Sequence, residues 1–195
     1  MDWKSGNDVI LEFDELIKSG KARPHTGPLK IGVDLGTANI VLAAVDQENR
    51  PVAGVTRRAS VVRDGIVVDY MGAVSIVRQL KAELEDILGE SLDFANAATA
   101  IPPGILEGNA KIIANVVDSA DFNVTNVVDE PTAAATVLGI RNGAVVDVGG
   151  GTTGISILKD GEVVFTADEP TGGTHMSLVI AGNKEISLDE AEEIK

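Results

Sequence analysis

Apolar residues recur with two different spacings along the chain, and each spacing predicts a different kind of element. Between residues 7 and 19 they fall on one face of a helix, at Val9, Phe13, Leu16 and Ile17. This spacing predicts a short amphipathic helix. Residues 21–28 contain two prolines and a glycine and predict a linker. Two interpretations of the helix stay open: it folds back on its own domain, or it docks onto a partner.

The next part of the chain begins with short apolar runs that are separated by turn residues. These runs predict an antiparallel meander of three strands, at residues 29–35, 40–45 and 51–55. An extended segment at 61–70 follows, with a turn at Asp64-Gly65. Helical and strand patterns then alternate, at 71–88 (helix), 94–101 (strand), 106–120 (helix) and 124–128 (strand). Alternation favours parallel strands, so we expect them to join the meander in a mixed sheet.

The last part of the chain opens on a second meander. An apolar run ends at Val148, and another begins at Ile155 after a turn rich in glycine and threonine. Asp160-Gly161 predicts a two-residue hairpin to a third run at 163–165. A helix is expected at about 174–181, and Ser187 has the character of a helix start.

The turn in that second meander carries candidate chemistry. It places Asp147 at the end of a strand and follows it with Gly149, Gly150, Gly151, Thr152 and Thr153. Glycines let the backbone approach a phosphate closely and turn several N–H groups toward it. A structural β-turn explains the same residues equally well when they are considered alone.

A second copy of the pattern favours the functional interpretation. Asp34 also ends an apolar strand, and Gly36, Thr37, Ala38 and Asn39 lead into the next strand. The offset between the two aspartates is too long for a solenoid repeat and suits a duplicated lobe. Two such lobes would present two aspartates and two glycine hairpins across one cleft.

That arrangement suits a magnesium nucleotide. Hairpin N–H groups and threonine hydroxyls would bind phosphate oxygens, while Asp34 and Asp147 would hold hydrated Mg²⁺. Glu130 lies where the strand linking the lobes ends, and it could orient or deprotonate an attacking water. The alternative for Glu130 is a carboxylate that only stabilises a helix start.

Composition narrows the choice of ligands and compartments. A net charge of −14 argues against electrostatic binding to nucleic acid or an anionic membrane. The chain has no cysteine and two histidines, which excludes a disulfide framework and leaves little material for a histidine metal cluster. Apolar runs are shorter than a membrane span and the first residues lack a secretory signal, so we expect a cytoplasmic protein.

These motifs together resemble the actin-like ATPase superfamily, which includes heat-shock chaperone ATPase domains, cell-shape proteins and sugar kinases. The segments 34–39 and 147–153 are similar to its two phosphate motifs, and 130–135 to its first connecting motif. The resemblance implies an α/β fold, the actin-like (ribonuclease H-like) fold, with two duplicated lobes and mixed sheets. It implies a helix and linker at 1–28, a first lobe at 29–140 and a second, incomplete lobe at 141–195.

The resemblance also implies ATP and Mg²⁺ as cofactors and assigns further residues to the nucleotide. Gly172 and Gly173 match a position near the ribose, and Glu192 and Lys195 match positions that flank the adenine. The family's later adenosine motif does not occur in these 195 residues. No residue matches the catalytic lysine of the heat-shock ATPases, so at most weak Mg-dependent ATPase activity is expected.

Three further stretches, at 61–73, 167–175 and 181–183, are similar to a family of ethanolamine-utilisation accessory proteins. This resemblance implies a chaperone-like, nucleotide-binding accessory role in ethanolamine utilisation, associated with bacterial microcompartment assembly, with pathway enzymes or shell proteins as partners. An alternative is an actin-like polymerising ATPase, which the Ala38-Asn39 variant of cell-shape proteins favours. A small-molecule kinase would need an aspartate base that the sequence does not identify.

Overall fold

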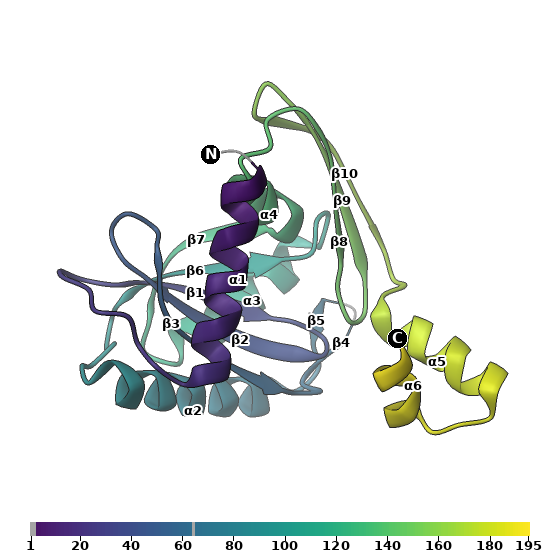
Figure 1. Ribbon diagram of the computed structural model, residues 1–195, viewed down its shortest axis with the longest axis horizontal. Helices are drawn as coiled ribbons and strands as arrows, with labels where there is room; N and C mark the ends of the chain where they lie inside the picture. The colour runs from purple at the N-terminus through teal and green to yellow at the C-terminus, as the bar shows by residue number, and fades with distance from the viewer. Residues whose placement is uncertain (1–2, 64) are drawn as a thin grey trace.

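The computed structural model describes residues 3–63 and 65–195 (Figure 1). Its larger part is built on a five-stranded sheet with the order β3-β2-β1-β6-β7. The strands are β1 (Lys30–Leu35), β2 (Asn39–Val45), β3 (Pro51–Arg58), β6 (Asn96–Ile101) and β7 (Asn123–Asp129). The first three pair antiparallel, while β6 pairs parallel with both β1 and β7. The predicted meander with added parallel strands, and hence the mixed sheet, is confirmed.

One face of this sheet is covered by α2 (Tyr70–Leu88) and α3 (Glu107–Asp118). The main core lies there and joins both helices to alternate strand residues, including Val77, Leu80, Leu84, Ile113, Val116, Ile31, Val33, Ile40 and Leu42. Asp69 caps α2 by accepting a hydrogen bond from the Gly72 N–H at 2.9 Å, and Gly89 ends it in the left-handed conformation. A small ribbon of β4 (Val62–Arg63) and β5 (Ile66–Val67) precedes α2; Asp64, the first residue of the predicted turn, lies outside the described residues.

The opposite face carries α1 (Trp3–Ser19) and α4 (Glu130–Leu138). Ala43 and Val45 alternate with the core residues Leu42 and Ala44, so they point toward these two helices. In Figure 1, α1 runs across this face and its first turns lie next to α4. The N-terminal helix therefore packs on its own lobe.

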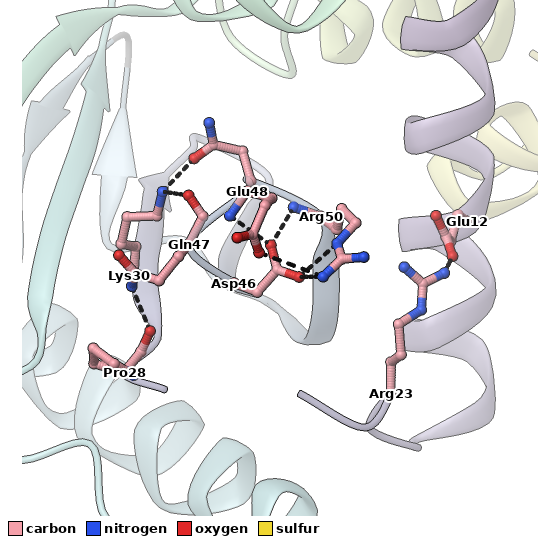
Figure 2. A network of polar contacts seen from close by, with 9 residues as sticks. Glu12, Arg23, Pro28, Lys30, Asp46, Gln47, Glu48 and Arg50 are labelled. Atoms are coloured by element: carbon pink, nitrogen blue, oxygen red, sulfur yellow. Dashed lines mark hydrogen bonds and ion pairs between the residues drawn. The ribbon is translucent and has the colours of Figure 1, made fainter. Parts of the chain in front are cut away.

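Polar contacts tie strand ends of the sheet and the middle of α1 to neighbouring loops (Figure 2). In the β2–β3 turn, the buried Asp46 carboxylate accepts hydrogen bonds from the Glu48 N–H at 3.0 Å, the Arg50 N–H at 2.9 Å and Arg50 Nε at 2.7 Å. The hydrogen bond from the Arg50 backbone is the main cause of the lowered pKa of Asp46. An ion pair between Glu12 and Arg23 connects α1 to the segment that leads into β1.

The second, smaller sheet contains β8 (Gly143–Val148), β9 (Thr153–Lys159) and β10 (Glu162–Glu169), followed by α5 (Gly173–Lys184) and α6 (Leu188–Ile194). The predicted hairpin at Asp160-Gly161 is confirmed, because both residues have positive φ, 56° and 90°. Within the described residues these three strands pair only antiparallel, so the expectation of a second mixed sheet is corrected. Consecutive strands joined by hairpins have no other way to pair.

In the part of the chain that the structure describes, no helix combines the length and apolar character needed to cross a membrane.

Candidate functional site

The two glycine hairpins meet each other. A Cβ at Gly150 would lie 2.7 Å from the Cβ of Ala38, and a Cβ at Gly151 would lie 2.7 Å from Thr37 Oγ1. Neither glycine has positive φ; among the described residues the positive-φ glycines lie elsewhere. These two glycines are thus required by the close approach of one loop to the other, a reason that the sequence pattern alone does not reveal.

A cavity of about 310 Å³ lies between the hairpins, within the size range of ligand pockets. Most of the predicted site residues line it: Asp34, Gly36, Thr37, Ala38, Asn39, Glu130, Asp147, Gly149, Gly150, Gly151 and Thr152. The fold therefore gathers residues from β1, β8, the two hairpins and the first turn of α4 around one space.

Three of these lining residues are carboxylic acids whose pKa is raised. Burial, and then the charge of Asp147, raises the pKa of Asp34 to about 6. Burial is also the main cause that raises the pKa of Glu130 to about 8, with Asp34 and Asp147 adding to it. The pKa of Asp147 is raised by burial as well. Negative charge is thus concentrated in the cleft at a cost that a bound cation would relieve.

No cationic side chain relieves this charge within residues 3–63 and 65–195. None of the ion pairs there involves Asp34, Glu130 or Asp147, and no Lys, Arg or His lines the cavity. The described side chains also contain no group of three His, Cys, Asp or Glu that could hold a metal directly. A site with only a few carboxylates fits Mg²⁺, because this ion keeps several of its water ligands and does not need to be surrounded by protein groups.

The hairpins supply the complementary donors. Thr37 and the buried Thr152 carry hydroxyls at the cavity wall. Within the described chain, the N–H groups of Thr37, Gly150 and Gly151 donate no hydrogen bond to the protein, whereas the Gly149 N–H donates to the Thr152 carbonyl at 2.9 Å. Free backbone N–H groups beside carboxylates fit a phosphate group that arrives with a metal ion.

Glu130 is the first residue of α4, directly after the helix cap. The Asp129 carboxylate accepts hydrogen bonds from the Thr132 N–H at 3.0 Å and from Ser156 Oγ, on β9, at 3.3 Å. Asp129 therefore caps the helix and leaves Glu130 facing the cavity. Both interpretations of Glu130 are compatible with its place at a helix start, but its raised pKa indicates that the cavity dominates its environment.

The remaining predicted residues lie beside the cavity and do not line it. Thr153 Oγ1 donates a hydrogen bond to the Thr171 carbonyl at 2.6 Å. Gly173 lies against the second hairpin, because its N–H donates to the Gly149 carbonyl at 2.8 Å. A Cβ at the neighbouring Gly172 would lie 2.5 Å from the same carbonyl oxygen. Close packing against the hairpin explains this glycine pair.

Glu192 and Lys195 form a separate cluster on α6 and at the end of the described chain. Lys195 Nζ contacts Glu192 Oε1 at 2.7 Å and the Gly173 carbonyl at 3.2 Å. The other Glu192 oxygen accepts a hydrogen bond from Ser177 Oγ at 2.5 Å. The hydrogen bond from Lys195, followed by that from Ser177, lowers the pKa of Glu192. The cluster joins α6 to α5, next to the Gly172-Gly173 turn.

Six further lining residues were not assigned to the site from the sequence: Leu35, Val41, Val62, Gly65, Pro102 and Val148. Gly65 has a φ of 72°, and a Cβ there would lie 2.7 Å from Pro102 Cγ. The Pro102-Pro103-Gly104 sequence was a visible signal of a sharp strand end, but only the fold brings it to the β4–β5 turn.

Comparison with known proteins gives consistent matches. The family model "Hsp70 protein" matches residues 70–180. Over 168 residues the chain is 52% identical to the ethanolamine utilization protein EutJ of Escherichia coli K12, which corresponds to 86% of the chain and 59% of that relative. The chain thus spans 59% of the length of this curated relative.

Solved structures agree with the sequence matches. The crystal structure of EutJ from Carboxydothermus hydrogenoformans superposes with a TM-score of 0.92 at 51% identity, covering 100% of this chain and 71% of that one. MreB 5 of Spiroplasma citri bound to AMPPNP gives a TM-score of 0.70 at 21% identity, covering 88% of this chain and 62% of that one. This second likeness shows the actin-like fold alone.

Proposed function

Because the chain belongs to the Hsp70 family and, within it, to the EutJ ethanolamine-utilisation proteins, we propose that it binds Mg-ATP between its two hairpins and serves ethanolamine utilisation as a chaperone-like accessory protein. The observation that carries the proposal is the meeting of both hairpins around one cavity with three carboxylates that form no ion pair among the described residues. The MreB 5 neighbour of the same fold, solved with AMPPNP, supports a nucleotide as the ligand.

The phosphates would be held by groups from both hairpins. Thr37 and Thr152 offer hydroxyls, and Thr37, Gly150 and Gly151 offer N–H groups toward one space. Because the two loops touch, a phosphate chain lying between them would contact both at once. Ligand binding would then hold the two sheets together, which gives the nucleotide a way to alter the affinity for a partner.

Asp34 and Asp147 are the residues that would hold Mg²⁺, through its water ligands, and bound Mg²⁺ would supply neutralising charge to the phosphates. With a pKa of about 8, Glu130 carries a proton at neutral pH in the metal-free cleft and can donate a hydrogen bond. After losing that proton it can accept one from a water molecule. No lysine is among the described residues that line the cavity, and we propose at most weak ATP hydrolysis.

Calorimetric titration of the full chain with Mg-ATP tests nucleotide binding. We expect saturable binding in the wild type and at least roughly tenfold weaker binding in Asp147→Asn, since the change removes charge from the metal side of the site. Thr153→Val is the matched control, because its hydroxyl is bonded to the Thr171 carbonyl outside the cavity. No detectable heat at about 1 mM nucleotide contradicts the proposal.

The partners we propose are enzymes of ethanolamine breakdown or shell proteins of a microcompartment, with the protein itself in the cytoplasm. Purified candidates can be titrated against the chain with and without Mg-ATP, and the affinity should depend on the nucleotide. A fluorescent fusion of the whole protein should gather at compartments in cells that carry them. Diffuse fluorescence there, with equal partner affinity in both nucleotide states, contradicts this part of the proposal.

The alternative, a polymerising actin-like ATPase, is compatible with the shared fold and is favoured by the Ala38-Asn39 variant at the cavity wall. Light scattering distinguishes the two. An accessory protein should keep constant scattering when ATP and Mg²⁺ are added at high protein concentration, whereas a filament former should show a rise that depends on nucleotide.

A further inference from the structure

The helix that carries Glu130 also touches the N-terminal helix. At its first turn, α4 is fixed to the second sheet: Asp129 accepts a hydrogen bond from Ser156 Oγ on β9 at 3.3 Å, and a Cβ at Gly154 would lie 3.1 Å from Pro131 Cγ. Nine residues later α4 ends at Leu138, capped by Gly139. The later part of α4 also packs on the second sheet, because Ala135 lies in one cluster with Val145 of β8 and Leu158 of β9, and its last turn meets α1 as well.

The contact at the far end of α4 is made mainly by backbone atoms. Gly6 of α1 is buried, and a Cβ there would lie 2.7 Å from the Val137 carbonyl oxygen, 2.8 Å from the Leu138 Cα and 3.2 Å from the Leu138 Cδ2. The two nearest atoms belong to the backbone, which cannot rotate away as a side chain can. A shift of the last turn of α4 by a fraction of an ångström must either move α1 or open this contact, since interiors transmit displacement when they are closely packed.

The rest of α1 is held elsewhere. Phe13 and Ile17 pack over Gly54 of β3, and Glu12 pairs with Arg23. Between these contacts and Gly6, α1 crosses a cavity of about 800 Å³ that α4 also lines. Val9 and Ile10 face this cavity, so the first half of α1 lacks the close packing that fixes the second half.

A helix of this length gains little stability by itself and depends on its packing. The second half of α1 has such packing on β3, and the first half has chiefly the Gly6 contact with α4. We propose that occupancy of the cleft controls the docking of the first half of α1 through α4. The inference rests on the proposed function, and it identifies the first half of α1 as the element that nucleotide binding regulates.

The direction of the effect follows from the attachments. A ligand held by both hairpins turns the second sheet about the hairpin contact, and β9 takes the first turn of α4 with it through Asp129 and Pro131. The Gly6 contact at the opposite end of α4 then opens. Residues 6–12 should lose protection when the cleft is occupied, while residues 14–19 keep theirs.

Amide hydrogen exchange on the full chain tests this inference, with binding of Mg-ATP measured in the same samples by calorimetry. We expect exchange in residues 6–12 to rise about fivefold with nucleotide, a typical lower value for coupling between two sites. Unchanged or slower exchange there, in a sample that binds Mg-ATP, overturns the inference and leaves the proposed function intact.

Two glycine variants test whether the Gly6 contact connects α4 to α1. Gly6→Ala inserts a methyl group where the Val137 carbonyl lies, so exchange at 7–12 should be raised without nucleotide and gain no more with it. Gly108→Ala in α3 is the matched control, because a Cβ there meets nothing within 4 Å, and it should keep the full response. Equal responses in the two variants overturn the role of the Gly6 contact.

A third variant tests the coupling between the cleft and α1 even if Mg-ATP does not bind. Asp129→Ala removes the cap of α4 and the bond to Ser156, and it should raise exchange at 6–12 roughly fivefold, the effect expected for loss of a helix cap. Residues 14–19 should be unchanged. If exchange at 6–12 also stays at the wild-type rate, α4 does not connect the cleft to α1. Absence of nucleotide binding by itself would contradict the proposed function only.

Discussion

The Cβ position of Gly150 lies 2.7 Å from the Cβ of Ala38, so two loops that are far apart in the sequence are in contact at the mouth of one cavity. Each loop belongs to a different sheet and follows a strand that carries a half-buried aspartate, Asp34 or Asp147. The distance leaves no space for a larger side chain at either position. The contact therefore sets the separation of the two glycine hairpins.

Gly150→Ala should destabilise the protein and weaken Mg-nucleotide binding, because the new methyl group collides with Ala38. Overpacking of this kind costs about 1–3 kcal/mol of unfolding free energy, measured by urea denaturation. The double variant Gly150→Ala with Ala38→Gly removes the colliding methyl and should recover most of the loss. A double variant no more stable than Gly150→Ala would show that the contact does not set the spacing.

The two neighbouring threonines should behave differently. Thr152 is buried at the cavity wall, whereas the Thr153 hydroxyl is bonded to the Thr171 carbonyl. We expect Thr152→Val to weaken Mg-ATP binding by about 1 kcal/mol, the typical net worth of one hydrogen bond. Thr153→Val should leave affinity unchanged in the same calorimetric assay. Equal losses in both variants would place the phosphates elsewhere.

The stability of the ligand-free protein should fall as pH rises. The pKa values of Asp34 and Glu130 are raised from 3.8 to about 6 and from 4.5 to about 8, so the folded state holds more protons than the unfolded state within that window. The free energy of unfolding therefore decreases from about pH 4 to pH 8. Thermal unfolding without divalent ions measures it.

Neutral substitutions identify the groups responsible. Glu130→Gln and Asp34→Asn should flatten the fall in Tm, while Glu162→Gln on the exposed edge of β10 should leave the slope as in the wild type. Mg²⁺ affinity should rise over the same pH window, since metal binding displaces the protons. A flat Tm profile in the wild type would show that the cleft does not hold these carboxylates in their neutral form.

The ion pair of Lys81 with Asp93 should lose different amounts of stability depending on which partner is replaced. The Lys81 ammonium group is buried and contacts Asp93 Oδ1 at 2.6 Å and the Ala120 and Asp121 carbonyls at 3.4 and 3.3 Å. Lys81→Met leaves these carbonyls unpaired, at a cost of about 1–3 kcal/mol. Asp93 is 65% exposed, so Asp93→Asn should cost about 0–1 kcal/mol. Urea denaturation compares them; a larger loss in Asp93→Asn would contradict this reasoning.

The sequence predicted the elements of the fold because their hydrophobic periods are clear. Their ends were less predictable: α1 begins at Trp3 and not at residue 7, and the strand that was predicted to begin at 51–55 ends at Arg58, an end that the sequence did not predict. The end of β3 depends on pairing between Arg58 and Asn39, a long-range contact that local apolar spacing does not contain.

The candidate site was predictable where a single segment of the sequence contains the functional side chains. The aspartates, the hairpin glycines and Glu130 stand at strand ends, and strand ends meet in this fold. The contribution of Gly65 and Pro102 depends on two turns coming together, and the need for Gly150 depends on a methyl group of the other lobe. Neither requirement can be predicted from the residues next to these positions in the sequence.

The most direct test of the two-hairpin phosphate site is amide NMR during titration with Mg-pyrophosphate, a ligand that carries phosphates without a base. We predict that the resonances of Thr37 and Ala38 and those of Gly150 and Gly151 shift together, with one shared dissociation constant. Shifts confined to one hairpin, or two different constants, would contradict a site that both hairpins form.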